Sequence, residues 1–450
     1  MEVEVKIDGK VTLLTFQKDT DINIEDGYCL VDDFGCCLLK IVLRGRKFEI
    51  IEKNNTLSDT EEELEAKLDQ LVLSVIEQEQ LGTDNTEHKD TGRENPYNPD
   101  DIKVSAKQFS IKLIKEMVDS EDIVLSPDFQ RHLVWDNRQR SRLIESILLR
   151  IPLPMFYFSE DKDGKLSVVD GLQRITAISD FMDDKFPLKG LEYLEKSCEG
   201  KRYTTLEPKY ARWFKLTQIS GNVIDPSSPY GVKYDIFRRI NTGGKPLNNQ
   251  EIRNCLAGEA LRDILNKMVK LEEFKRATDK SIKSTRMEDS EMALRFILFR
   301  DLMTSEGNIN RYDSYMDASL DALTERLRKS TINDLEHHVE AFSRAMYNAE
   351  YLFESKYAFR KVRTKDLKRD ASKQLINKAL FVSWSVLLAD YDPERVKRKN
   401  KRGVLKNPIA KMIEEDSELW TYLSYGTNGK SNLLCAFSRA EKLIKAQLNY

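Results

Sequence analysis

The chain begins with an alternation of apolar and polar residues that is typical of β-strands. Residues alternate from Glu2 to Ile7 and again from Val11 to Phe16, with the hairpin-like pair Asp8-Gly9 between them. Further short strands are predicted around residues 28–31, 37–43 and 47–51. The pattern therefore predicts a small β-domain over residues 1–55, in which no side chain indicates a particular chemistry.

A helical period replaces the alternation after this domain. Thr60 has the position of an N-cap before a helix that ends near Gln80, and its apolar face is formed by Leu64, Leu68, Leu71, Val75 and Ile76. Residues 82–101 are polar and contain two prolines, which is typical of a linker. Residues 56–101 are accordingly interpreted as one helix and a polar linker.

Residues 102–260 mix both periods and predict an α+β domain. Helices are expected at 110–119 and 137–149, strands at 155–158 and 165–169, a turn at 161–165, and another helix after Gly171. Residues 261–450 keep a helical period throughout, with runs at 292–302, 315–327, 335–353, 375–388 and 433–448. They predict an α-helical domain.

The composition excludes several classes of protein. Charged residues make up 33% of the 450 positions, and no apolar run is long enough to span a membrane. The N-terminus lacks a signal-peptide pattern, so a cytoplasmic protein with free thiols is expected. The six cysteines form no CxxC pair and only four histidines are present, which argues against zinc.

Charge is unevenly distributed along the chain. Residues 1–100 hold 24 acids and 11 bases, whereas residues 101–450 hold 51 acids and 61 bases. The segment 395–402 carries six bases and no acid. It is interpreted either as a solvated loop or as a contact for the phosphates of DNA through Lys397, Arg398, Lys399, Lys401 and Arg402.

The richest chemistry lies at residues 168–178, where a strand feeds a helix through Asp170-Gly171. Such a corner leaves backbone N–H groups free at the helix start, which suits phosphate. Arg174 adds a guanidinium, Asp170 a carboxylate for a metal or water, and Gln173 an amide that orients a nucleophile. The structural alternative is that Asp170 caps the helix and Arg174 forms an ion pair.

Two further segments offer walls for a ligand pocket. Gln130 and Arg131 are polar groups among apolar neighbours, and the alternative for them is a surface loop. Arg239 and Asn241 precede Gly243-Gly244, a glycine pair whose N–H groups suit a phosphate but which equally ends a helix. Either Asn248 or Asn249 is expected to cap the helix that follows.

Three blocks occur in order: Pro127-Asp-Phe-Gln-Arg131 with Trp135, Asp170-Gly-Leu-Gln-Arg174, and Phe237-Arg-Arg-Ile-Asn241 through Gly244, Leu247 and Glu251. Together they resemble the N-terminal domain family of GmrSD-type restriction endonucleases, also called domain of unknown function 262. The resemblance implies a ParB/sulfiredoxin-like domain at 102–260 that binds and hydrolyses nucleotides. Such domains govern restriction of modified foreign DNA, typically phage DNA.

The resemblance also implies roles for single residues. Asp170, Gln173 and Arg174 would be catalytic, with Asp170 on Mg²⁺, and a nucleoside triphosphate would be the substrate. Its nucleotide contacts would be Gln130, Arg131, Gly171, Thr176, Arg239, Asn241 and Gly244. Leu172 departs from the family's usual Asp-Gly-Gln-Gln-Arg corner, which puts hydrolysis in doubt more than binding.

The nuclease of this family is often a fused HNH domain, whose chemistry needs histidines. After residue 261 the histidines are the adjacent pair His337-His338, within a helical pattern. A separate nuclease subunit is therefore expected as partner, with DNA as ligand. Two hypotheses remain open: a nucleotide-hydrolysing defence protein, and a non-catalytic DNA-binding or regulatory module that keeps the fold.

Overall fold

The computed structural model describes residues 2–7, 10–18, 27–32, 35–44, 47–60, 63–68, 71, 102–125, 135–240, 247–304, 309–368 and 370–450. Within these ranges no helix has the length and apolarity that crossing a membrane requires. All six cysteines are free thiols, as expected.

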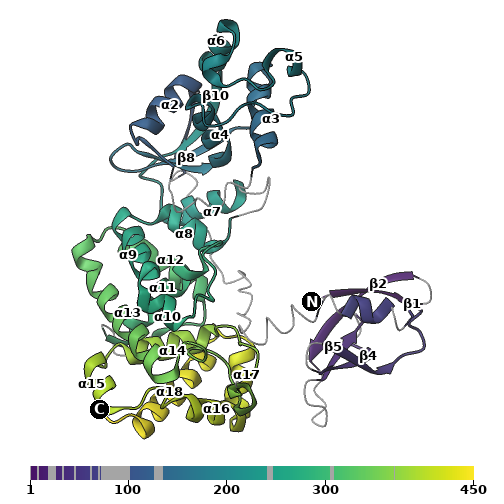
Figure 1. Ribbon diagram of the computed structural model, residues 1–450, viewed down its shortest axis with the longest axis vertical. Coiled ribbons are helices and arrows are strands. Elements are labelled where there is room, and N and C mark those ends of the chain that lie inside the picture. The colour runs from purple at the N-terminus through teal and green to yellow at the C-terminus, as the bar shows by residue number, and fades with distance from the viewer. Residues whose placement is uncertain are drawn as a thin grey trace.

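The N-terminal strands form an antiparallel meander, in the order of the sequence (Figure 1). The strands are β1 (Glu2–Ile7), β2 (Lys10–Lys18), β3 (Gly27–Val31), β4 (Cys37–Arg44) and β5 (Lys47–Lys53). One face of the sheet is closed by Leu64 and Leu68 of the helical stretch 63–68. Thr60 and Glu63 form a reciprocal cap at its start, which confirms the predicted helix start; residues 72–80 lie outside the described ranges.

The central region holds a second sheet, of order β6-β10-β8-β9-β7. Its elements are β6 (Val104–Ser110), α2 (Ile111–Asp119), β7 (Ile123–Val124), α3 (Asn137–Leu148), β8 (Phe156–Glu160), β9 (Leu166–Asp170), α4 (Leu172–Met182), α5 (Glu195–Cys198), η3 (Tyr203–Thr205), α6 (Pro208–Leu216), β10 (Gln218–Ile224), α7 (Tyr230–Ile240) and α8 (Asn249–Leu256). The predicted helix–strand–turn–strand–helix pattern is confirmed, with β8 placed slightly later than expected.

Two cores lie on opposite faces of this central sheet. One face buries Phe156, Phe158 and Val223 under α2, α3, α4 and α6. Gly221 is required there, because a Cβ at this position would lie 2.8 Å from the Phe158 ring. On the other face, Val169 and Ile224 pack against aromatic residues of α7. Elsewhere on that second face Ser159 is buried, Ser220 and Asn222 are partly buried, and Gln108 is exposed.

Residues 259–447 form the helical region that the sequence predicts (Figure 1). Its elements are α9 (Glu259–Lys270), α10 (Glu272–Ala277), α11 (Glu288–Thr304), η4 (Ile309–Arg311), α12 (Met316–Leu327), α13 (Ile332–Phe353), η5 (Thr364–Leu367), α14 (Lys378–Leu388), α15 (Pro393–Lys399), α16 (Lys406–Glu415), α17 (Ser417–Ser424) and α18 (Lys430–Gln447). α13 packs against α9, α10 and α14, and α14 packs against α18. The helix expected from residue 375 starts later, because Asn377 caps it and Ile376 bridges to Arg360.

Polar contacts join the central and helical regions at α8. Arg253 is 1% exposed and its Nε donates to Asp321 Oδ1 of α12 at 2.7 Å. The same guanidinium bonds Asp317, also of α12. Asn248, rather than Asn249, caps α8 and forms a reciprocal capping box with Glu251. α8, in which the third sequence block ends, is therefore fixed to the helical region.

Candidate functional site

The Asp170 corner has the geometry that its sequence predicts. β9 ends at Asp170, α4 begins at Leu172, and Gly171 between them has a φ of 102°. Gly171 is the N-cap of α4, and no side chain caps the helix there. The alternative that Asp170 caps the helix is therefore wrong. The N-terminal N–H groups of α4 keep the partial positive charge that attracts anions.

Arg174 is built into the wall of this corner. It is 8% exposed, and its guanidinium donates to the Pro154 carbonyl and, at 3.3 Å, to the Met155 carbonyl. It also donates to Asp170 Oδ2 at 2.8 Å and lies 4.2 Å above the Phe156 ring. Burial lowers the pKa of Arg174, and the Asp170 carboxylate opposes this shift. The ion pair of the structural alternative is thus present. The hydrogen bonds of Arg174 to the two carbonyls fix the segment before β8 to α4.

Asp170 and Gln173 retain free bonding capacity. The Asp170 side chain is 38% exposed, and one of its oxygens accepts from Arg174. The Oε1 atom of Gln173 is buried and has no hydrogen-bond partner in the part of the chain that the structure describes. A buried acceptor without a partner calls for an explanation such as a bound water, ion or ligand. Thr176 is half-buried one turn further along α4.

The register of the sheet brings further residues to Asp170. Asp170 pairs with Tyr157 on β8, Tyr157 with Asn222 on β10, and Asn222 with Ala106 on β6. Tyr157 packs on the face of the sheet that carries α7, and Asn222 lies beside it in the same row. The pairing of β8 with β9 shifts register between Tyr157 and Phe158, so Asp170 lies at the irregular end of this row. Tyr157 and Asn222 are half-exposed.

Neither Tyr157 nor Asn222 was a candidate from the sequence. The signal for Tyr157 was its place between two core phenylalanines, Phe156 and Phe158, since alternation assigns it to the opposite face. Asn222 carried no comparable signal, because only the pairing of β10 with β8 places it beside Tyr157.

Of the other candidate nucleotide contacts, some belong to the described residues and some do not. Arg239 is exposed in the last turn of α7. Gln130, Arg131, Asn241 and Gly244 lie outside the described residues. The convergence of all three sequence blocks on one cleft therefore stays a prediction, and the described geometry bears on the second block and the sheet beside it.

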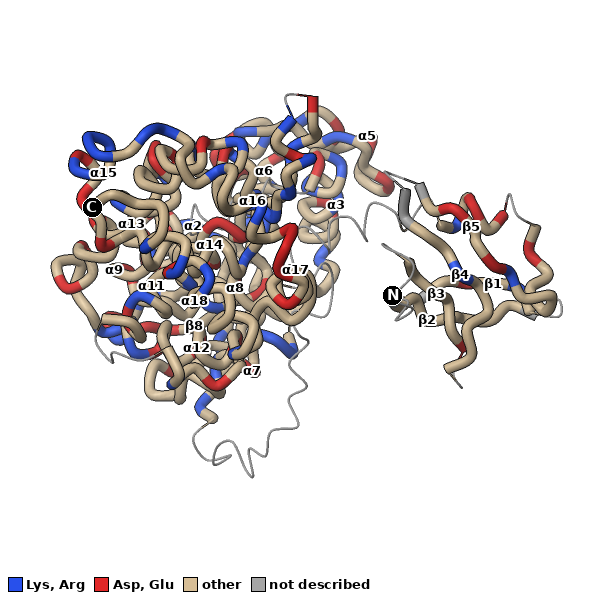
Figure 2. The backbone as a smooth tube through the Cα atoms, turned by 90° about the horizontal axis from the view of Figure 1, so that it is seen from below, with Lys and Arg blue, Asp and Glu red and all other residues tan. Residues whose placement is uncertain are grey.

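The basic segment near residue 400 is ordered on the helical region (Figure 2). Lys397, Arg398 and Lys399 form the last turn of α15, so the interpretation as a solvated loop is wrong for them. Tyr351 of α13 donates to the Asn400 carbonyl at 2.9 Å, and Arg402 pairs with Glu350. All five candidate bases are exposed. Cations at a helix C-terminus also stabilise the helix, with or without DNA.

Three other titratable groups of the helical region have internal contacts or are buried. Lys356 donates to the Ala371 carbonyl and Lys373 pairs with Asp279, so these bases near α15 are engaged. His338 is 2% exposed within α13, and burial lowers its pKa to about 4. Among the described residues, no three His, Cys, Asp or Glu side chains gather as a metal site.

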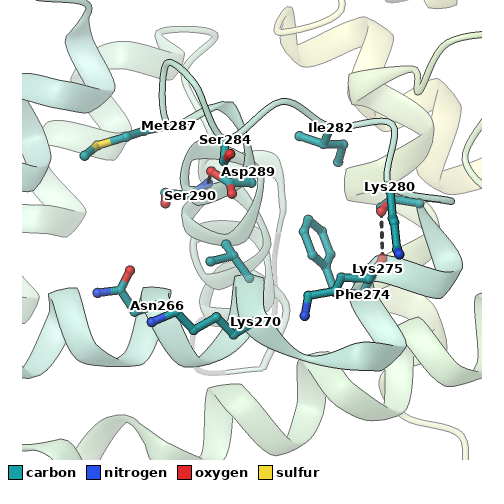
Figure 3. Close-up of a pocket in the computed structure, with 12 residues that line it drawn as sticks. Asn266, Lys270, Phe274, Lys275, Lys280, Ile282, Ser284, Met287, Asp289 and Ser290 are labelled. Carbon is teal, nitrogen blue, oxygen red and sulfur yellow. Dashed lines mark hydrogen bonds between the residues drawn. The ribbon is translucent and has the colours of Figure 1, made fainter. Parts of the chain in front are cut away.

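A hollow of about 360 Å³ lies in the helical region, outside the candidate site (Figure 3). It is lined by residues of α9 and α10 and by the segment that enters α11, including Lys270, Lys275 and Asp289. Burial raises the pKa of Asp289. The sequence pattern placed no site here.

Comparison with known families supports the resemblance that the three blocks indicated. Residues 114–257 match the family model described as GmrSD restriction endonuclease, N-terminal domain. The matched segment contains the whole Asp170 corner, β8, β10, α7 and α8, and indicates a domain of restriction systems. No curated protein matches the chain.

Proposed function

We propose that the central region is a ParB/sulfiredoxin-like domain that binds and hydrolyses a nucleoside triphosphate, in a prokaryotic defence system that restricts modified DNA. The observation that carries the proposal is the accessible Asp170 carboxylate at the uncapped start of α4. It lies within the segment that matches the restriction family. Phosphates favour a free helix N-terminus, and an adjacent carboxylate suits hydrolysis with a divalent ion.

The residues of the corner fit a magnesium ion bound together with phosphates. Asp170 offers a half-exposed carboxylate, a hard oxygen donor of the kind that Mg²⁺ prefers, and Gln173 has an unpaired amide oxygen that can accept from a water. When bound, the ion would neutralise charge on the phosphates. Gln173 would then orient the attacking water, and the first turn of α4 would hold the phosphate oxygens through its N–H groups.

Arg174 has a different role in this proposal from the catalytic one that the resemblance implies. Its guanidinium already binds two carbonyls and Asp170. We assign it to positioning: it sets the direction of the Asp170 carboxylate and holds Pro154 and Met155 beside α4. The groups proposed to contact phosphate are those that the family resemblance implies: Arg131, Arg239, Asn241 and Gly244.

Nucleotide turnover tests the proposal. Asp170→Asn and Gln173→Ala are each expected to lower phosphate release by about 100-fold, since each removes a group that acts on the reacting atoms. Asp163→Asn is the matched control, because Asp163 is exposed in the turn between β8 and β9. Equal turnover in the wild type and in the Asp170 and Gln173 variants would contradict the catalytic assignment.

A second function, a non-catalytic DNA-binding or regulatory module, is favoured by two observations. The Arg174 guanidinium already forms hydrogen bonds within the chain, and Leu172 replaces a polar residue that the family usually has at this corner. Under this alternative, duplex DNA binds while nucleotides neither bind nor turn over. Titration of plain and modified duplexes, with and without nucleoside triphosphate, separates the two functions.

DNA contact is proposed at the end of α15. Removing one basic side chain that binds a phosphate reduces the slope of log affinity against log salt by about 0.9. Replacing Lys397, Arg398, Lys399 and Lys401 together by alanine is therefore expected to flatten that slope by about 3.6. A control with four alanines is placed at Lys185, Lys267, Lys411 and Lys445, each of which pairs with a neighbouring acid. DNA cleavage is expected only when a separate nuclease subunit is added.

A further inference from the structure

The face of the central sheet that carries Tyr157 continues beyond the row of Asp170. Behind the row of Asp170, Tyr157 and Asn222 lies a second row, in which Ser220 pairs with Gln108 on β6. Gln108 donates through Nε2 to Ser220 Oγ at 2.8 Å. Met155 shares the face of Tyr157 by alternation, and 41% of it is exposed. Polar and aromatic side chains thus form a partly exposed surface across four strands.

Hydrogen-bonding groups are available on this surface across the sheet from Asp170. Within the described chain, the Asn222 amide makes no hydrogen bond, and the Tyr157 hydroxyl likewise has no partner. Both side chains are half-exposed, so they are accessible to a ligand. An amide offers one donor beside one acceptor, which is the pattern that nucleobase edges present.

The separation of these groups suits one particular orientation of a nucleotide. Adjacent strands lie about 4.8 Å apart, so Asn222, two strands from Asp170, lies about 10 Å away across the sheet. That separation is comparable to the distance from the terminal phosphate to the base in an extended nucleoside triphosphate. The aromatic Tyr157 lies between the two ends.

We propose that the nucleoside triphosphate lies across the strands, with its phosphates at the start of α4 and its base over Asn222. Tyr157 packs against the sugar and base, and the Asn222 amide reads the base edge. The proposal rests on the proposed function, since it needs a nucleotide at Asp170. It adds that the site selects a particular base, so that its substrate is more than a polyphosphate.

Equilibrium titrations of the full-length chain with ATP, GTP, CTP, UTP and inorganic tripolyphosphate test this orientation. The wild type is expected to bind one nucleotide about tenfold more tightly than the weakest, because one base pairs with the Asn222 amide. Asn222→Ala is expected to remove most of this preference and to leave tripolyphosphate affinity within about twofold. Tyr157→Ala should weaken all four nucleotides by about tenfold, and Tyr157→Phe should not.

Three controls keep the outcomes distinct. Asn407→Ala changes an exposed asparagine on α16 and should alter nothing. Asn222→Ser, compared by thermal melting, replaces Asn222→Ala if the latter does not fold. Asp170→Asn should weaken nucleotides and tripolyphosphate alike.

The results separate the orientation from the proposed function itself. If all four nucleotides bind equally, or the Asn222 variants keep the wild-type preference while Asp170→Asn abolishes binding, the orientation is wrong and the nucleotide site stands. If neither nucleotides nor tripolyphosphate bind the wild type, both the proposed function and the orientation are wrong.

Discussion

Replacing Gly171 by alanine is expected to destabilise the central region through two separable effects. Gly171 has a φ of +102°, which an L-residue rarely adopts, and that strain costs roughly 1–2 kcal/mol. A Cβ built there would overlap Phe156 Cδ1 and lie 2.9 Å from Phe156 Cε1 and 3.3 Å from Arg174 Nη2. Phe156 is fully buried and cannot move freely, so the overlap adds about 1–3 kcal/mol.

Gly164→Ala is the matched comparison for the backbone effect alone. Gly164 has a φ of +83° in the turn before β9, and a Cβ there would meet nothing within 4 Å. Gly164→Ala should therefore cost roughly 1–2 kcal/mol, and Gly171→Ala roughly 2–5 kcal/mol.

Calorimetry of the full chain, with hydrogen exchange of peptides covering 166–182, measures both effects. Exchange localises the destabilisation to the central region, which matters because a chain with several cores need not unfold in one step. Equal destabilisation in the two variants would refute the argument that Gly171 is required by the approach of Phe156. A strongly destabilised Gly171 variant without faster exchange in α4 would also contradict it.

The other predictions concern the contacts that hold the central region in place. Arg253→Ala removes the buried guanidinium that pairs with Asp317 and Asp321, and should lower the free energy of unfolding by about 3–5 kcal/mol. A change below about 1 kcal/mol by calorimetry would show that the contact is dispensable. Asn248→Ala removes the cap of α8 and should cost about 1 kcal/mol in denaturant unfolding, and no change would argue against the capping box. Burial lowers the pKa of Lys233 from 10.5 to about 8, so the unfolded chain binds more protons between those values and stability should rise as pH increases from 8 to 10.5. Lys233→Met should therefore stabilise the protein most below pH 8. The increase in the urea unfolding midpoint of this variant over the wild type should become smaller at higher pH, and an increase that stays constant would contradict the predicted direction of the pH dependence.

Most elements could be predicted because their signals are local. Alternation fixed the strands of the N-terminal sheet, and Thr60, Asp170-Gly171 and Asn248 marked where helices begin. The hydrophobic period also predicted the helices α3 and α13. Boundaries shifted where a tertiary contact intervened, as at Ile376, whose bridge to Arg360 precedes α14.

The candidate site could be predicted only in part. Residue types and spacing were sufficient to select Asp170, Gln173 and Arg174, and the family match includes them. The pattern did not show that Arg174 donates to the carbonyls of Pro154 and Met155 rather than facing solvent. The residue type does not distinguish a buried guanidinium from an exposed one. The partners of Arg174 depend on its burial in the folded chain.

The sequence by itself determined the succession of strands and helices, the Gly171 turn, and the family of residues 114–257, because these depend on neighbours within a few positions or on ordered motifs. Only the tertiary structure decided that Tyr157 and Asn222 lie in one row of the sheet with Asp170, and that Arg253 joins α8 to α12. These relations depend on which strands pair, in which register, and on which helix packs against which. Pairing is a choice among distant segments, and local patterns of polarity do not specify it.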